Sequence, residues 1–211
     1  MTGKQFKVES SKLKVIAGAL LLLTFNFGLS TALLADTASQ NPTSDDAISG
    51  TWDGTAGTRY TVVDDHPDST GVDFLTHGTT TAGNLTFGYA AFSIPAGSTS
   101  LSVQVIYYDQ KTATQACDIG GRLKVGTTYY NATGHNPANG VWTLRTDTWA
   151  TNPKSAAAWT VDDVNGVGAN NLTAFGWVST DANPTIRLSS VIVQVTYTLA
   201  SGGRRRMVVF E

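Results

Sequence analysis

The fold is decided by the stretch Arg187-Leu-Ser-Ser-Val-Ile-Val-Gln-Val-Thr-Tyr-Thr-Leu199 in a chain of 211 residues. From Val191 to Leu199, apolar side chains occupy every second position, and the positions between them are mostly polar. Successive side chains of a β-strand point to opposite faces. The alternation therefore predicts a strand with one buried face.

The same pattern occurs earlier in the chain. Leu101–Tyr107 aligns with Val191–Tyr197, and both segments contain Val-Gln-Val-x-Tyr. Two matched long strands predict an all-β sandwich in which one face of each sheet is buried. Period-two alternation then places four valines on the inner face and two glutamines outside. The valines are Val103, Val105, Val193 and Val195, and the glutamines are Gln104 and Gln194.

Further strand-like segments are separated by turns rich in Gly, Pro and Asn. Eight to ten strands predict a jelly-roll-like antiparallel β-sandwich. The expected strands are Arg59–Asp64, Phe74–Thr76, Leu85–Ile94, Leu101–Gln110, Ile119–Val125, Thr128–Asn131, Trp142–Trp149, Leu172–Ser179 and Thr185–Leu199.

One segment, Ser155–Gly166, departs from the β pattern. Thr160 and Asp163 have the spacing of a capping box, and a glycine follows as a stop signal. We expect a helix of one or two turns across one end of the sandwich. Trp159 and Val164 would close the core there.

The segment Ala158–Gly168, then Phe175-Gly-Trp177 and the closing alternating strand, resembles uncharacterised jelly-roll domains. Such domains occur in bacteriophage structural proteins and in secreted proteins known from environmental sequences. The resemblance covers roughly the last 55 residues. It implies a structural or binding module, and it carries no binding residues over to this chain.

Four regions are expected along the chain. Residues 1–35 combine a Lys-containing start with an apolar segment, which predicts a hydrophobic helix serving as a signal peptide or, if uncleaved, as a membrane anchor. Residues 36–51 read as a flexible linker, and residues 52–200 as the β-sandwich domain. Residues 201–211 form a basic, then apolar, tail.

Charge bears on the partners of this protein. The span from Asp36 to Gly203 contains 14 Asp, no Glu and 7 Lys plus Arg, a balance of −7. Nucleic-acid binding needs clustered Lys and Arg, so we expect no nucleic-acid partner. Membrane contact is expected only through the N-terminal segment.

The loop from Asp64 to Asp73 is the candidate metal site. Its carboxylates are Asp64, Asp65, Asp68 and Asp73. Calcium prefers oxygen ligands of this kind, so the loop could hold a structural Ca²⁺ ion. The alternative is a solvated turn in which Asp side chains cap backbone groups, because the spacing is not that of an EF-hand.

Aromatic residues suggest a ligand surface. Tyr107/Tyr108 and Tyr129/Tyr130 are adjacent pairs, so one member of each pair must face away from the core if both lie on strands. Tyr108 and Tyr130, together with Trp52, are the candidates for stacking on a sugar. The alternative is that these aromatic residues are buried in the core.

Catalytic signatures are missing from the sequence. No Gly-x-Ser-x-Gly, His-Glu-x-x-His or phosphate-loop motif is present, and the domain has no Glu for a paired-carboxylate glycosidase. The sequence therefore favours a secreted or surface-exposed structural or adhesive protein. A phage virion component and a carbohydrate-binding module are the alternatives.

Edge strands and the tail bear on assembly. With few Lys residues to block an edge, at least one sheet edge should be covered by residues 36–51 or by another subunit. The tail could add as a strand to a second copy of the chain, its arginines meeting the acidic domain. The residues concerned are Arg204, Arg205, Arg206, Val208 and Phe210.

Overall fold

The computed structural model describes residues 35–53, 57–65, 73–78, 82–179 and 185–200. The described residues belong to one compact unit, Leu33–Glu211. The expected N-terminal helix, Asp68 and the 201–211 tail lie outside the described ranges. Within those ranges, no helix has the length and hydrophobicity needed to cross a bilayer.

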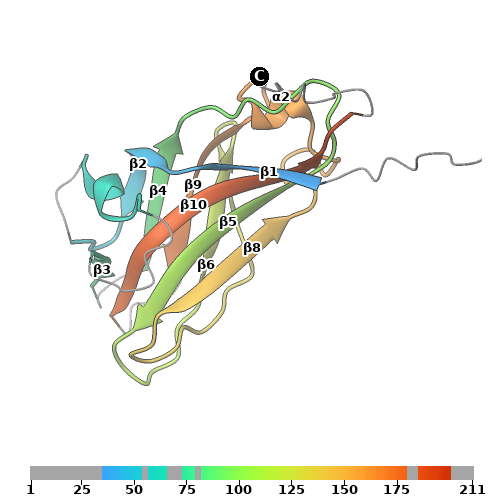
Figure 1. Cartoon of the computed structure of the whole chain (residues 1–211). Helices are drawn as coiled ribbons and strands as arrows, with labels where there is room; N and C mark the ends of the chain where they lie inside the picture. Colours follow the sequence, from blue (N-terminus) through green and yellow to red (C-terminus); the bar gives the residue numbers. More distant parts are fainter. Residues whose placement is uncertain (1–34, 54–56, 66–72, 79–81, 180–184, 201–211) are drawn as a thin grey trace, which may run out of the picture. The chain divides into compact units, whose positions relative to one another are not determined.

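Two antiparallel sheets form a jelly-roll-like sandwich, which confirms the predicted fold class (Figure 1). Sheet A has the order β1-β10-β5-β8, with the short β3 also paired to β10. Its strands are β1 (Ala35–Gln40), β3 (Leu75–His77), β5 (Thr99–Lys111), β8 (Thr143–Trp149) and β10 (Ile186–Thr198).

Sheet B has the order β2-β4-β9-β6-β7. Its strands are β2 (Pro42–Ser49), β4 (Gly83–Tyr89), β6 (Ile119–Val125), β7 (Thr128–Asn131) and β9 (Leu172–Ser179).

The two matched strands are direct neighbours in sheet A. In the antiparallel β5–β10 register, Gln104 lies opposite Gln194, and each valine lies opposite a valine. All four valines are fully buried, while both glutamines keep part of their surface exposed. The predicted alternation is thus confirmed, because each valine side chain faces sheet B.

The core lies between the sheets. Sheet B contributes Phe87, Phe175 and Trp177, all fully buried, and the rings of Phe87 and Phe175 lie 6.5 Å apart. Each large apolar side chain buried in this way stabilises the fold by about 1.5–3 kcal/mol.

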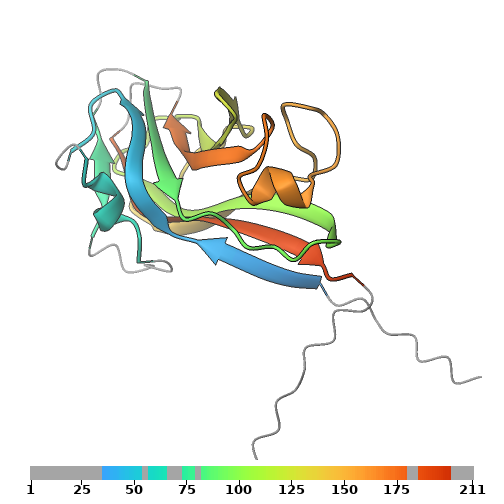
Figure 2. The same cartoon turned by 90° about the horizontal axis from the view of Figure 1, so that it is seen from above.

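The predicted helix is confirmed as α2 (Val161–Val164), which lies at one end of the sandwich (Figures 1 and 2). Its capping box is complete: the Asp163 amide donates to Thr160 Oγ1, and the Thr160 amide donates to Asp163 Oδ2, both at 3.1 Å. Trp159 and Val164 are buried, as expected. The Trp159 indole donates to the Trp149 carbonyl at 2.9 Å.

The prediction of a linker over residues 36–51 is wrong. β1 pairs with β10 at the edge of sheet A, and β2 pairs with β4 at the edge of sheet B. The segment has a polar, linker-like composition, but the exposed edge of each sheet supplies the backbone hydrogen-bond partners that such a segment needs. Of the two ways in which an edge was expected to be covered, the structure shows the one that uses residues 36–51.

The predicted strand Arg59–Asp64 is also wrong. Residues Arg59–Val62 form a 3-10 helix, η1. The Asp45 carboxylate accepts hydrogen bonds from the amides of Gly57, Arg59 and Tyr60 at 2.8, 3.2 and 2.9 Å. In a strand these amides would donate to a neighbouring strand. Here they donate to Asp45 instead, so the segment forms a helical turn.

Candidate functional site

Trp52, predicted to bind a ligand, is buried instead. Its side chain is 6% exposed, and its ring lies 5.2 Å from that of Trp177 and 4.8 Å from that of His77. A stacking platform must leave at least one ring face accessible to the ligand, whereas Trp52 packs within the hydrophobic core. That part of the prediction is wrong.

Tyr108 and Tyr130 do not share a surface. Tyr108 is half-buried on β5 of sheet A, opposite the exposed Leu144. Tyr130 is half-buried on β7 of sheet B and lies opposite Leu123, whose side chain is fully buried. The two tyrosines therefore belong to different sheets, and they do not form one binding site with Trp52.

The described carboxylates of the predicted metal loop stay near the surface. Asp65 and Asp73 are exposed, and Asp64 is half-buried. Within the described ranges, no three Asp, Glu, His or Cys side chains come together as a metal site. Because Asp68 lies outside these ranges, the calcium site remains a prediction. The tail residues proposed for assembly also lie outside them.

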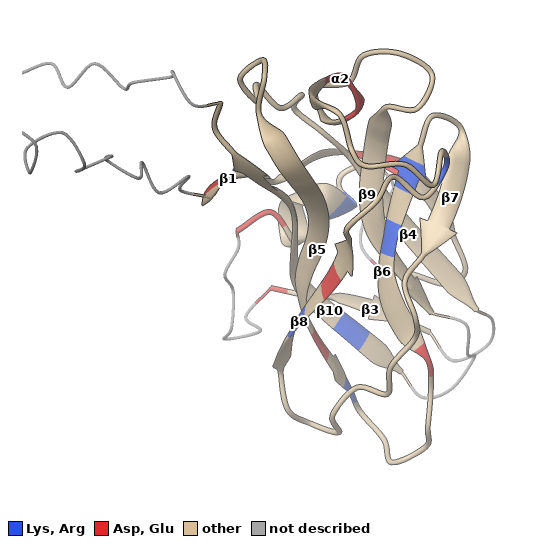
Figure 3. Cartoon of the chain, turned by 90° about the vertical axis from the view of Figure 1, so that its right-hand side faces the viewer, with Lys and Arg blue, Asp and Glu red and all other residues tan. Residues whose placement is uncertain are grey.

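A polar cluster that the sequence analysis missed covers the outer face of sheet B. On β6, Leu123 and Val125 are fully buried, so Arg122 and Lys124 project outward. Lys124 pairs across the β6–β7 hairpin with Tyr129. Figure 3 shows the two basic positions following each other along β6. We call Asp46, Arg122, Lys124 and Tyr129 the sheet B cluster.

Asp46 is the centre of hydrogen bonding in the sheet B cluster. Lys124 Nζ lies 2.8 and 3.0 Å from its two carboxylate oxygens. The Tyr129 hydroxyl donates to Asp46 Oδ2 at 3.2 Å, and the Thr86 hydroxyl donates to the same oxygen at 3.3 Å. The hydrogen bond to Asp46 raises the pKa of Lys124 above its usual value. Through its hydroxyl, the Tyr129 side chain is thus tied to the same carboxylate as Lys124.

Arg122 has no such partner. Its guanidinium carbon lies 4.2 Å from the centre of the Tyr129 ring, a cation–π contact. Within the part of the chain that the structure describes, its side chain makes no hydrogen bond or ion pair, and its Nε atom is buried. Burial lowers the pKa of the Arg122 guanidinium from its usual value. The cation is thus partly desolvated without a compensating anion.

A groove opens beside Arg122. It has a volume of about 120 Å³ and is lined by Ala47, Ile48, Ser49, Asn84, Arg122 and Tyr129. The Asn84 side-chain amide donates to the Ser49 hydroxyl at 2.8 Å. We call this hollow the sheet B groove. Its hydroxyl, amide and guanidinium groups can all form hydrogen bonds with a polar ligand.

Gly176 lies opposite both Arg122 on β6 and Thr86 on β4, beside the cluster. A Cβ atom at Gly176 would lie 2.0 Å from the Leu85 carbonyl oxygen and 2.8 Å from the Thr86 Cα. Only glycine permits this close approach of β4 and β9. Because Gly176 has no side chain, the outer surface of the sheet is depressed beside Arg122.

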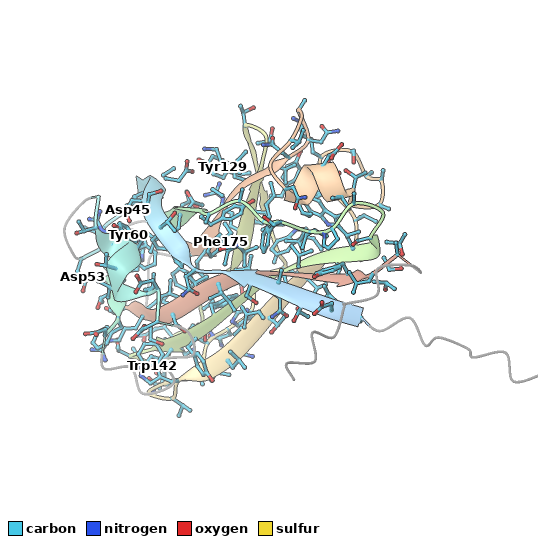
Figure 4. All side chains as sticks on the ribbon, turned by 45° about the horizontal axis from the view of Figure 1, so that its top comes forward. Asp45, Asp53, Tyr60, Tyr129, Trp142 and Phe175 are labelled. Atoms are coloured by element: carbon cyan, nitrogen blue, oxygen red, sulfur yellow. The ribbon has the colours of Figure 1, made fainter. Side chains whose placement is uncertain are left out.

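A second aromatic group lies on sheet A. The Arg187 guanidinium carbon is 4.6 Å from the centre of the Phe74 ring, and the Phe74 and Trp142 rings are 6.0 Å apart. Ile186 and Leu188 are fully buried, so the half-buried Arg187 points to the outer face. Figure 4 shows Trp142 and Tyr129 on opposite sides of the molecule. The two arginine–aromatic contacts are therefore separate surfaces.

An acid–histidine pair lies between β5 and the 132–139 segment. Asp109 is fully buried and lies 2.9 Å from His135 Nε2 through Oδ2, with Arg145 Nε 3.8 Å from Oδ1. Burial raises the pKa of Asp109, although His135 and Arg145 oppose the shift. His135 also stacks on Tyr107, with ring centroids 6.1 Å apart. The Asp109–His135 hydrogen bond ties this segment to β5.

Comparisons with known proteins give similarity of structure only. No family model matches the chain, and no curated protein matches its sequence. The CBM22-1 xylan-binding domain from Paenibacillus barcinonensis Xyn10C is 11% identical, with a TM-score of 0.44 over 81% of this chain and all of that domain.

The C-terminal CBM6 of LamC, a laminarinase from Zobellia galactanivorans, is 14% identical, with a TM-score of 0.39 over 76% of this chain and 99% of that one. The enzymatically active domain of bacteriophage CBA120 tailspike protein 4 is 11% identical, with a TM-score of 0.38 over 75% of this chain and 19% of that one. Identities and TM-scores this low carry no inference about ligand or activity.

Proposed function

We propose that this protein is a glycan-binding module whose ligand occupies the sheet B groove. The observation that carries the proposal is the state of the Arg122 guanidinium. It stacks on Tyr129 but has no hydrogen-bond or ion-pair partner among the described residues, and it lines the groove with Asn84 and Ser49. Groups of this kind fix the orientation of a ligand through a few convergent hydrogen bonds.

The chemistry of the groove suits a saccharide. Sugar hydroxyls lie in pairs along a ring, and a guanidinium offers several N–H donors in a rigid plane that can serve two oxygens at once. Ser49 and Asn84 add a hydroxyl and an amide, which can both donate and accept. The groove is shallow rather than enclosed, which suits a segment of a longer chain that enters and leaves along the sheet.

Preorganisation supports the proposal. The Asp46–Lys124 ion pair and the Tyr129–Asp46 hydrogen bond hold the aromatic ring in place before any ligand arrives. A side chain that is already ordered loses less entropy on binding, so more of the contact energy appears as affinity.

The biological setting is proposed on the sequence alone. Residues 1–35 have the pattern of a secretion signal or anchor, so we propose an extracellular or cell-surface location, where glycan binding would serve adhesion. A virion component is the alternative setting, and self-assembly through the tail remains a separate proposal. We propose binding rather than catalysis because the sequence contains none of the catalytic motifs considered above.

The test is a binding titration of the full-length protein against a panel of immobilised neutral and acidic oligosaccharides. We expect at least one saccharide to bind, and replacement of Tyr129 by Ala to weaken that binding about tenfold or more. The matched control is Trp142→Ala, which removes an aromatic ring from the outer side of sheet A and should leave affinity unchanged.

Two results would overturn the proposal. Absence of binding to every saccharide would remove glycan recognition as the function. Binding that survives Tyr129→Ala but is lost in Trp142→Ala would place the ligand on sheet A, beside Phe74 and Arg187, rather than in the sheet B groove.

A further inference from the structure

We infer that the ligand of the sheet B groove is an acidic saccharide whose anionic oxygens bind the Arg122 guanidinium. This inference rests on the proposed function and adds the chemical class of the ligand. It follows from the balance of charge across the sheet B cluster, from the surroundings of Arg122, and from comparison with the other arginines.

The charge balance of the cluster leaves one cation uncompensated. Asp46 is the single carboxylate in the cluster, and both of its oxygens lie within 3.0 Å of Lys124 Nζ. These two charges cancel. Arg122 then contributes one net positive charge, and Tyr129 offers it only the face of an aromatic ring.

The surroundings of Arg122 make this charge significant. A cation that is partly removed from water and has no anion beside it is unfavourable unless a partner arrives. Burial lowers the pKa of Arg122, and Tyr129 opposes this shift. A carboxylate or sulfate on the ligand would restore the lost interactions through charge-assisted hydrogen bonds.

The other arginines of the domain show what a structural role looks like. Arg59 donates through Nε to the Asp53 carbonyl at 2.8 Å and through Nη2 to the Trp52 carbonyl at 3.2 Å. Arg145 lies 3.8 Å from the buried Asp109 carboxylate. Among the described arginines, Arg187 resembles Arg122 most closely, since it stacks on Phe74 and its Nε donates no hydrogen bond, but it lies on the other sheet. Arg145 Nε also donates none, but this arginine has the Asp109 carboxylate beside it.

The geometry favours a carboxylate over a sulfate. A guanidinium and a carboxylate are both planar, so two parallel N–H···O bonds can form between them. A uronic-acid unit presents this group next to ring hydroxyls, which would reach Asn84 and Ser49 along the groove. A sulfated sugar offers the same charge with tetrahedral oxygens, and the experiment distinguishes the two.

The experiment compares matched saccharides on the full-length protein. Oligogalacturonate is tested against its methyl ester, and a sulfated galactan against its desulfated form. We expect oligogalacturonate to bind at least tenfold more tightly than the ester, with a smaller preference in the sulfate pair. The preference should shrink as salt rises from 0.05 to 0.5 M, because screening weakens a partly exposed ion pair.

The variants assign the preference to one side chain. Arg122→Met should reduce the acid-to-ester affinity ratio to near one, and Arg122→Lys should retain part of it. Arg187→Met is the control, because it removes an arginine that also stacks on a ring, and it should leave the ratio unchanged. The ester comparison on the unaltered protein keeps the test valid if a variant does not fold.

Each outcome separates this inference from the proposed function. Equal affinity for the acid and its ester, with binding still dependent on Tyr129, overturns the acidic ligand and leaves glycan binding standing. A ratio that persists in Arg122→Met, or that is lost in Arg187→Met, also overturns the inference. Absence of binding to all four saccharides and to the wider panel overturns both proposals.

Discussion

The outer faces of the two sheets have similar positions but different chemistry. On sheet A, outward polar groups satisfy one another: Gln104 Nε2 donates to the Thr148 hydroxyl at 3.2 Å, and Gln194 Nε2 donates to the Ser39 hydroxyl at 3.0 Å. On sheet B, the ion pair of Lys124 and Asp46 leaves Arg122 without a partner among described residues. Two outward groups that already bond to each other gain little from a ligand, whereas a partly desolvated and unpaired cation gains much.

The difference arises from residue size as well as charge. β9 places Ala174 and Gly176 opposite Lys124 and Arg122, so the long basic side chains stand beside very small neighbours. Sheet A has larger side chains at the matching outward positions, where Gln104, Ile106 and Tyr108 of β5 lie opposite Thr148, Thr146 and Leu144 of β8. The groove beside Arg122 therefore borders the small residues of β9.

The largest expected effect on stability comes from adding a side chain at Gly176, in the depression on the outer face of sheet B. Gly176→Val should destabilise the protein by about 3 kcal/mol, because overpacking against the β4 backbone forces strands apart. Urea denaturation followed by tryptophan fluorescence measures the change. Thr146→Ala, at an exposed outward position of β8 on sheet A, should stay within about 0.5 kcal/mol. Equal effects at the two positions would show that the small residues of β9 have no special role.

A second prediction concerns His77, an unpaired polar side chain in the interior, in contrast to Arg122 at the surface. His77 is fully buried, and neither ring nitrogen has a hydrogen-bond partner within the described ranges. Burial lowers the pKa of His77 below the usual 6.5. Its contribution to stability is therefore fully present above about pH 6.5 and is lost as the pH falls through the lower folded-state value.

The measurement is the free energy of unfolding between pH 7 and pH 5. The wild-type protein should lose up to about 1.4 kcal/mol per pH unit through this one proton, and His77→Gln should show a flatter slope. The raised pKa of Asp109 acts in the opposite direction, since its contribution falls as pH rises, so the difference between the two proteins is the relevant quantity. Identical slopes would contradict the assignment to His77.

The smallest expected effect tests whether the sheet B ion pair serves stability or position. The Lys124 and Asp46 side chains are 22% and 25% exposed, so solvent screens their attraction. Lys124→Met should cost only about 0.5 kcal/mol in unfolding free energy. This variant also leaves the Asp46 carboxylate without its Lys124 partner beside Tyr129. The binding free energy for an acidic saccharide should therefore weaken by more than the unfolding free energy does. A loss of several kcal/mol would instead make the pair a main support of the fold.

Much of the fold follows from local patterns. The Val-Gln-Val alternation specifies which side of β5 and β10 is buried, because a strand has a period of two. The capping box of α2 is equally local, since Thr160 and Asp163 satisfy each other within one turn. The sheet B hairpin also had a readable signal: only Gly126 and Thr127 separate β6 from β7, so Lys124 had to pair with Tyr129.

Sequence alone determined the strand alternation, the class of fold and the short helix, since each depends on residues close together in the chain. Tertiary structure decided the rest. β1 and β2 are strands because the sheet edges offer them hydrogen-bond partners. η1 forms where the Asp45 carboxylate, 15 residues before Tyr60, accepts hydrogen bonds from backbone amides. Asp46 reaches Lys124 across 78 positions of sequence. That long-range pairing neutralises one cation and leaves Arg122 unpaired, and no local pattern encodes it.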